Sequence, residues 1–198
     1  MPGMGANRKM YENWNDSCSY RFLDWPQYDG ELSLECWAQK IITLNDISSH
    51  DIIGGSSLGG IIAIEIYKIL GNPKVVLLGS AVNISEINSL LLKLTALSDY
   101  APIKLIQLLT GKYDGDLLQM FSGSDPKFIK AMCKLIATWQ GFSGPSEKLI
   151  RIHGSKDLVI NCPQEAELIL AGGHLLAMSH ARECQALLNS SLNLEKLN

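Results

Sequence analysis

The sequence lacks the features that direct a chain into a membrane or onto a polyanion. No stretch approaches the roughly 18 consecutive apolar residues of a membrane span, and the opening MPGMGANRKMYENW lacks the apolar segment of a signal peptide. The formal net charge is −3, so no basic excess favours nucleic acid. We therefore expect a cytoplasmic protein that spans no membrane and binds no nucleic acid.

Cysteine is also sparse, and its pattern excludes the common zinc and disulfide motifs. The cysteines are odd in number and widely spaced, and no C-x-x-C pair occurs. They are Cys18, Cys36, Cys133, Cys162 and Cys184. We expect reduced, mostly buried thiols, which is the common state of free cysteine. Because the sequence contains no metal-binding constellation, we also expect no cofactor.

What the sequence does contain is an alternation of strand-like and helix-like segments. Short β-rich runs occur at 20–25, 51–54, 74–78, 148–153 and 167–171. Between the first two runs, ELSLECWAQKIITLN places apolar residues at helical spacing, and residues 58–70 are apolar nearly all round. This alternation predicts a single α/β domain over residues 1–198, with a mostly parallel sheet flanked by helices.

Residues 84–141 break this alternation. SLLLKLTAL, APIKLIQLL and DPKFIKAMCKLIATW are helical in pattern, and no β-rich run separates them. We therefore predict a helical cap insertion that covers the carboxyl edge of the sheet and lines a pocket with leucines. The same leucines could instead form the core of the cap itself.

The segment DIIGGSSLGG contains the pattern G-x-S-x-G, with Ser57 at its centre. In this pattern a reactive serine sits on a sharp strand-to-helix turn, and glycines two positions before and after it let the backbones pass closely. A β-rich run precedes Ser57 and a helical segment follows it, which makes Ser57 the candidate nucleophile. The start of that helix also directs backbone N–H groups toward an anion forming beside the serine.

Other interpretations of these glycines are weaker. Gly54 is followed two residues later by Ser56, which excludes the dinucleotide pattern G-x-G-x-x-G. Gly59 is followed by Gly60 rather than lysine, which excludes a P-loop. A tight turn without a reactive serine remains the alternative. The nucleophile therefore needs a base and an acid elsewhere in the chain.

Candidate partners follow Ser57 in the order acid, then histidine. Asp157 comes just after the run 148–153 and His174 just after the run 167–171, at the strand ends where open α/β sheets build their sites. Alone, Asp157 would more often be a solvated turn residue, and His174 a hydrogen-bonded residue at a helix start. The remaining acids and bases are less well placed relative to the strands: His50, His153, His180, Asp24, Asp51 and Asp99.

These segments together resemble the α/β-hydrolase family, in particular its small esterase-like members. The resemblance covers nearly the whole chain and rests on PGMGA at 2–6, LDWP at 23–26, GGSSLGG at 54–60, HGSKD at 153–157 and GGH at 172–174. It implies that Ser57 is the nucleophile, Asp157 the acid and His174 the general base. It further implies that the N–H groups of Met4 and Leu58 form the oxyanion hole, which can contribute several kcal/mol to transition-state stabilisation.

The beginning of the sequence departs from the pattern of that family. In α/β hydrolases a central strand precedes the oxyanion loop and lies between the strand matching 20–25 and the nucleophile strand; here the loop starts at residue 2. An empty central lane would leave two rows of backbone groups unpaired. We therefore expect a sequence shortened at its N-terminus, with residues 1–4 at the end of that lane and residues 20–25 poorly paired or displaced.

Two functions of different classes are compatible with these patterns. The first is a serine hydrolase that cleaves a small-molecule carboxylic ester or thioester through an acyl-enzyme, with a partly apolar acyl group. A lactone would use the same residues. The alternative is a non-catalytic ligand-binding or interaction protein on the same scaffold, and a Ser57 that fails to react with a fluorophosphonate would favour it.

Overall fold

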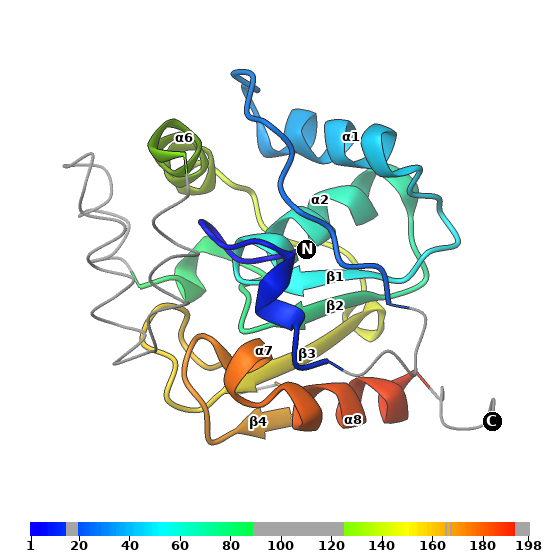
Figure 1. Cartoon of the computed structure of the whole chain (residues 1–198), viewed down its shortest axis with the longest axis vertical. Coiled ribbons are helices and arrows are strands. Elements are labelled where there is room, and N and C mark those ends of the chain that lie inside the picture. The colour runs from blue at the N-terminus through cyan, green and yellow to red at the C-terminus, as the bar shows by residue number, and fades with distance from the viewer. Residues whose placement is uncertain (15–19, 89–124, 165, 167, 193–198) are drawn as a thin grey trace.

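A single parallel sheet organises the computed structural model, which describes residues 1–14, 20–88, 125–164, 166 and 168–192. Within these residues the strands are β1 (Ile53–Ser56), β2 (Val75–Leu78), β3 (Leu149–Gly154) and β4 (Leu168–Leu170). They are ordered β1-β2-β3-β4, and each neighbouring pair is parallel (Figure 1). The register places Val75 between Ile53 and Leu149. The predicted α/β architecture is confirmed.

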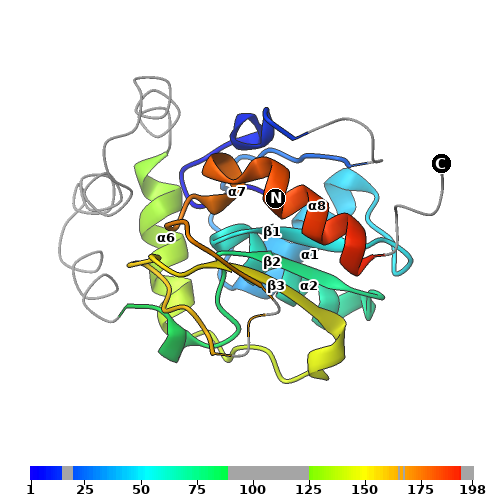
Figure 2. The same ribbon diagram turned by 90° about the horizontal axis from the view of Figure 1, so that it is seen from below.

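Helices cover both faces of this sheet (Figures 1 and 2). One face carries α1 (Leu34–Asn45), α2 (Leu58–Leu70) and α6 (Pro126–Ala137). The other carries the 3₁₀ helix η1 (Arg8–Tyr11), α7 (Leu176–Ser179) and α8 (Ala181–Ser191). The 3₁₀ turns η2 (Ile84–Glu86) and η3 (Ser146–Lys148) lie in connecting segments. None of the helices in the described part of the chain has the length and apolar character needed to cross a bilayer.

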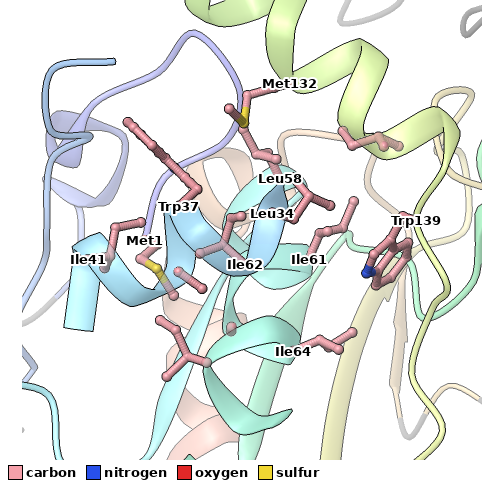
Figure 3. Close-up of a cluster of buried hydrophobic side chains, with 14 of the residues drawn as sticks. Met1, Leu34, Trp37, Ile41, Leu58, Ile61, Ile62, Ile64, Met132 and Trp139 are labelled. Carbon is pink, nitrogen blue, oxygen red and sulfur yellow. The ribbon is translucent and has the colours of Figure 1, made fainter. Parts of the chain in front are cut away.

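The first core cluster lies between the sheet and the helices α1, α2 and α6. Figure 3 shows Trp37 of α1, Ile62 of α2 and Met132 of α6 among its side chains, and all three are fully buried. Burying a side chain of this kind contributes about 1.5–3 kcal/mol. The second core cluster lies on the opposite face, under η1, α7 and α8. Two covered faces explain why every residue of β2 is buried.

Helix α1 begins and ends where its sequence provides capping groups. Ser33 Oγ accepts a hydrogen bond from Cys36 N–H at 3.0 Å, which satisfies a donor of the first turn. Asp46 follows the last turn with a φ of 51°, a left-handed conformation that aspartate adopts more readily than most residues. Trp37 and Ile41 form its buried face, so the helix predicted from the apolar spacing is confirmed.

The strand predicted at 20–25 is wrong, because residues 20–31 contain neither strand nor helix. The first residue of the sequence lies against the outer edge of β1 instead. Met1 N donates to Gly54 O at 2.9 Å, and Met1 O accepts from Ser56 N–H at 3.1 Å. Residues 20–25 are therefore not paired with the sheet, in agreement with the expectation that they would be poorly paired or displaced. Its side chains alternate between the two clusters, with Phe22 against the second and Trp25 against the first.

Most of the predicted insertion, residues 89–124, lies outside the described residues. The third of its expected helical segments forms α6, whose first turn is capped by Asp125 Oδ1 accepting from Lys127 N–H at 2.9 Å. Helix α6 lies near the edge of the sheet formed by the carboxyl ends of the strands (Figures 1 and 2). The cap over 84–141 stays a prediction.

The described cysteines carry free thiols. Cys133 and Cys184 are buried, Cys162 is partly buried and Cys36 is exposed. Burial, with a smaller contribution from the charge of Glu183, raises the pKa of Cys184 to about 12, so its thiol stays protonated.

Candidate active site

Ser57 lies on the turn between β1 and α2 in a conformation that few residues adopt. Its φ of 52° and ψ of −117° fall outside the regions that non-glycine residues usually populate. A Cβ added to Gly55 would lie 2.4 Å from the carbonyl carbon of Gly59, and one added to Gly59 would lie 2.4 Å from Met1 O. The glycines of G-x-S-x-G are needed because strand, helix and the first residues of the chain meet here backbone to backbone.

Hydrogen bonds on both sides of Ser57 hold this strained turn. Ser57 N–H donates to Leu78 O at 3.1 Å, and Ser57 O accepts from Ser80 Oγ at 2.7 Å. Although Ser57 stands at the N-cap of α2, its side chain makes no capping hydrogen bond. Its Oγ is therefore available to another partner.

His174, in the segment after β4, provides that partner. His174 Nε2 lies 2.9 Å from Ser57 Oγ, and His174 Nδ1 lies 2.8 Å from Asp157 Oδ2. An ionised carboxylate only accepts hydrogen bonds, so Nδ1 carries the proton and Nε2 presents its lone pair to the serine hydroxyl. The structure thus brings together three side chains that come from three separate strand ends.

Asp157 stands in the loop after β3 with both carboxylate oxygens bonded. Oδ1 accepts from Val159 N–H at 2.8 Å and from Ile160 N–H at 3.0 Å, while Oδ2 faces His174. Burial alone would raise the pKa of Asp157. Hydrogen bonds from His153, His174 and the backbone, together with attraction to His174, outweigh burial and hold that pKa well below its usual value. Asp157 is therefore ionised at neutral pH.

A second histidine, His153, lies against Asp157, although the sequence favoured His174 over it as the base. His153 is 1% exposed at the end of β3, with Nε2 3.3 Å from Asp157 Oδ2 and 3.0 Å from Ile160 O. The signal that could have found this contact is the spacing in HGSKD. A histidine near the carboxyl end of a strand, four residues before an acid, faces the loop that carries the acid.

The two residues expected to supply the oxyanion donors, Met4 and Leu58, are each next in sequence to Ser57 or to a residue that lies against it. Leu58 is the first residue of α2, so its N–H has no acceptor within the helix. Gly3 lies against Ser57, since a Cβ on Gly3 would be 3.7 Å from Ser57 Cβ, and Met4 follows directly. Among the described residues neither Met4 N–H nor Leu58 N–H donates a hydrogen bond. Both N–H groups therefore have no acceptor within the described part of the chain.

The other candidate acids and bases have different surroundings. His180 Nδ1 contacts Ser179 Oγ at 2.9 Å. Three candidates are exposed at the surface: His50, Asp24 and Asp51. Asp99 lies outside the described residues. Within the part of the chain that the structure describes, no group of three or more His, Cys, Asp or Glu side chains could hold a metal ion.

Solved structures match this chain over nearly its whole length, whereas no family model and no curated protein matches it. A hydrolase from Oleispira antarctica is 18% identical over 100% of this chain and 89% of that one, with a TM-score of 0.70. An enol-lactonase from Burkholderia xenovorans LB400 is 14% identical over 97% and 89%, with a TM-score of 0.74. An esterase from Thermogutta terrifontis is 13% identical over 97% and 87%, with a TM-score of 0.71. The chain has the α/β-hydrolase fold.

Proposed function

We propose that this chain, folded as an α/β hydrolase, is a serine hydrolase of carboxylic esters or thioesters. The observation that carries the proposal is the series of contacts from Ser57 Oγ to His174 at 2.9 Å and from His174 to Asp157 at 2.8 Å. Such a series activates an otherwise weak nucleophile. The similar solved structures are a hydrolase, an enol-lactonase and an esterase, which supports the same class of reaction.

In the first half of the proposed reaction, His174 Nε2 takes the hydroxyl proton while Ser57 Oγ bonds to the carbonyl carbon of the substrate. The carbonyl oxygen becomes an oxyanion that Met4 N–H and Leu58 N–H bind, and the N-terminus of α2 adds its positive dipole end. When this intermediate collapses, the bond to the leaving oxygen or sulfur breaks, and His174 donates its proton to that atom. An acyl-enzyme on Ser57 remains.

In the second half, water replaces the leaving group. His174 Nε2 takes one proton from the water as its oxygen bonds to the acyl carbon, and the bond between that carbon and Ser57 Oγ then breaks. The proton returns to Ser57, and the carboxylic acid leaves. Throughout both halves Asp157 stays ionised, orients His174 and stabilises the imidazolium that forms twice.

The acyl group is expected to be partly apolar. This part of the proposal rests on the leucine-rich segments SLLLKLTAL and APIKLIQLL, which lie outside the described residues. A chain-length panel of p-nitrophenyl esters tests it. The value of kcat/KM should rise from acetate to longer acyl chains, and a value that falls steadily with chain length would contradict an apolar acyl site.

Labelling by a fluorophosphonate probe tests the nucleophile. The wild-type protein and the Ser56→Ala variant should be labelled, because Ser56 is the neighbouring serine of the same motif and is buried in β1. The Ser57→Ala variant should not be labelled. Label that survives in Ser57→Ala would overturn the assignment of Ser57. An unlabelled wild-type protein would favour the alternative, a ligand-binding protein without catalysis.

A further inference from the structure

The expected oxyanion donor Met4 N–H belongs to the peptide unit that also contains the carbonyl group of Gly3. A trans peptide is planar, so its C=O and N–H bonds point in opposite directions, and no cis peptide occurs among the described residues. Any contact that fixes the direction of Gly3 O therefore fixes the direction of Met4 N–H.

Gly3 O is held by two donors. Ala6 N–H donates to it at 3.1 Å and closes a tight turn in which Gly5 has a φ of 76°. The indole Nε1–H of Trp25 donates to the same oxygen at 3.0 Å from a segment more than 20 residues away. Met1 is already bonded to β1, and the indole adds a contact from a distant segment to the Gly3 carbonyl itself.

Trp25 is itself fixed by aromatic neighbours. Its ring centroid lies 6.3 Å from that of Trp37 on α1 and 5.8 Å from that of Phe128 on α6. The backbone of residues 20–31 forms no strand, so side-chain packing of this kind sets the position of the segment. The indole N–H is consequently a rigid donor aimed at the peptide beside Ser57.

We propose that Trp25 is a positioning residue that aims Met4 N–H at the developing oxyanion. The inference rests on the proposed hydrolase function, in which Met4 N–H binds the oxyanion. A second effect acts in the same direction, because a hydrogen bond accepted by a peptide carbonyl polarises the N–H of that peptide and strengthens it as a donor. Trp25 needs no contact with the substrate to act in this way.

The test uses Trp25→Phe, which removes the indole N–H and keeps an aromatic ring. Trp139→Phe is the matched control, because the indole of Trp139 also donates one hydrogen bond, to Glu65 Oε1 at 2.7 Å rather than to the oxyanion loop 2–6. The first readout is the NMR signal of the Gly3–Met4 peptide. Gly-Met occurs once in the sequence, so labelling glycine with ¹³C at the carbonyl and methionine with ¹⁵N isolates this peptide.

We expect the Gly3 carbonyl shift and the Met4 amide order parameter to change in Trp25→Phe and to stay at wild-type values in Trp139→Phe. Removing one oxyanion donor typically costs about 10²–10³ in kcat, and a misaimed donor retains part of its effect, so kcat should fall about tenfold at unchanged KM. Binding of an alkyl trifluoromethyl ketone, whose adduct with the serine carries an oxyanion, should weaken by a similar factor of about ten.

An unchanged Gly3–Met4 signal in Trp25→Phe would overturn the proposal, as would equal losses of kcat in the two variants. If Trp25→Phe does not fold, β-(3-benzothienyl)alanine at position 25 keeps the bicyclic shape without the N–H, and the same measurements decide. The failure of the hydrolase function would look different. In that case the wild-type protein would not react with the fluorophosphonate, and the Gly3–Met4 signal would still decide whether Trp25 orients this peptide.

Discussion

The Nε2 atom of His153 lies 3.3 Å from Oδ2 of Asp157, the same oxygen that His174 contacts at 2.8 Å. This nitrogen also lies 3.0 Å from the carbonyl oxygen of Ile160, which can only accept, so Nε2 of His153 carries a proton. His153 therefore donates toward the carboxylate and toward the loop that holds it. This double contact limits the directions in which Asp157 can present Oδ2 to His174.

Replacing His153 by phenylalanine should lower both stability and activity. Phenylalanine has a similar volume but donates no hydrogen bond, so Asp157 and Ile160 O each lose this donor. A buried polar group left unpaired costs about 1–3 kcal/mol, and urea unfolding should show a loss of free energy in this range. The value of kcat for a p-nitrophenyl ester should fall more than KM changes.

The variant His50→Phe is the control for that experiment, because His50 is exposed. It should change neither stability nor kcat appreciably. Equal kcat values for the wild type and His153→Phe would show that the two backbone N–H groups on Oδ1 suffice to orient Asp157.

The lowered pKa of Asp157 should make stability depend on pH in the acidic range. The folded protein holds this pKa below the ordinary value of 3.8, so the unfolded chain binds more protons there. The Asp157 carboxylate therefore makes its full contribution to the free energy of unfolding at pH values well above 3.8. This contribution is lost as the pH falls toward the pKa of the folded protein. In urea titrations at decreasing pH, the advantage of the wild type over Asp157→Asn should shrink below about pH 4. An advantage that grows on acidification would contradict the lowered pKa.

Gly59→Ala tests the backbone crossing beneath Ser57. A Cβ there would lie 2.4 Å from Met1 O and 2.5 Å from Pro2 O. Alanine favours a helix over glycine by about 0.8–1.0 kcal/mol, but overpacking typically costs about 1–3 kcal/mol, so the steric effect should win and the melting temperature should fall. Labelling of Ser57 by the fluorophosphonate should slow as well. A shift of Met1 and Pro2 would also move Met4, whose N–H is the proposed oxyanion donor.

Gly173→Ala is the matched control, since its nearest neighbour in the described structure would be Lys156 O at 3.9 Å. We expect a change in unfolding free energy within about 0.5 kcal/mol. A Gly59→Ala variant as stable as Gly173→Ala would show that the first residues can move away from the turn without cost.

Sequence patterns predicted the helices and strands that carry their own local pattern of apolar residues, and they predicted which strand ends would meet. The run 74–78 forms β2 and the apolar segment 58–70 forms α2, because each carries its own pattern of burial. Ser57, Asp157 and His174 were predicted to converge, and they lie in contact because parallel strands bring their carboxyl ends to one edge. The segment 20–25 has the same β propensity, yet a strand also needs a neighbour, and Met1 lies at the edge of β1.

The two contacts that the sequence analysis did not predict depend on how loops direct single side-chain atoms. The hydrogen bond from Trp25 Nε1 to Gly3 O depends on how an unpaired segment crosses the oxyanion loop. The contact of His153 with Asp157 depends on the conformation of a loop of three intervening residues. Residue propensity and hydrophobic periodicity predict secondary structure, but they do not predict how the conformation of a loop orients one side-chain atom.

The loop that carries Asp157 is paired with the segment just before residue 89. Ile87 and Ile160 form an antiparallel bridge, and Asn161 N–H donates to Glu86 O at 2.7 Å. The side chain of Glu86 binds the guanidinium of Arg151 on β3 at 2.7 and 3.2 Å. These side chains are only 20% and 12% exposed, respectively. The ion pair therefore anchors the segment 84–88 to β3 and, through the bridge, supports the Asp157 loop.

Glu86→Gln should reduce activity although Glu86 contacts none of the three proposed catalytic side chains. Glutamine keeps the size but cannot neutralise Arg151, whose Nε already has no hydrogen-bond partner among the described residues. Breaking a fully buried pair costs about 3–5 kcal/mol, and the partial exposure here reduces the expected loss of unfolding free energy to about 1–3 kcal/mol.

Adding Arg151→Met to Glu86→Gln should restore part of that lost free energy, because it removes the uncompensated charge. Glu31→Gln is the control, since it breaks the 2.6 Å contact between Glu31, which precedes α1, and Lys40 of α1, and it should lower stability without lowering kcat. If the two glutamine variants have the same kcat, the Glu86–Arg151 pair stabilises the fold without positioning Asp157.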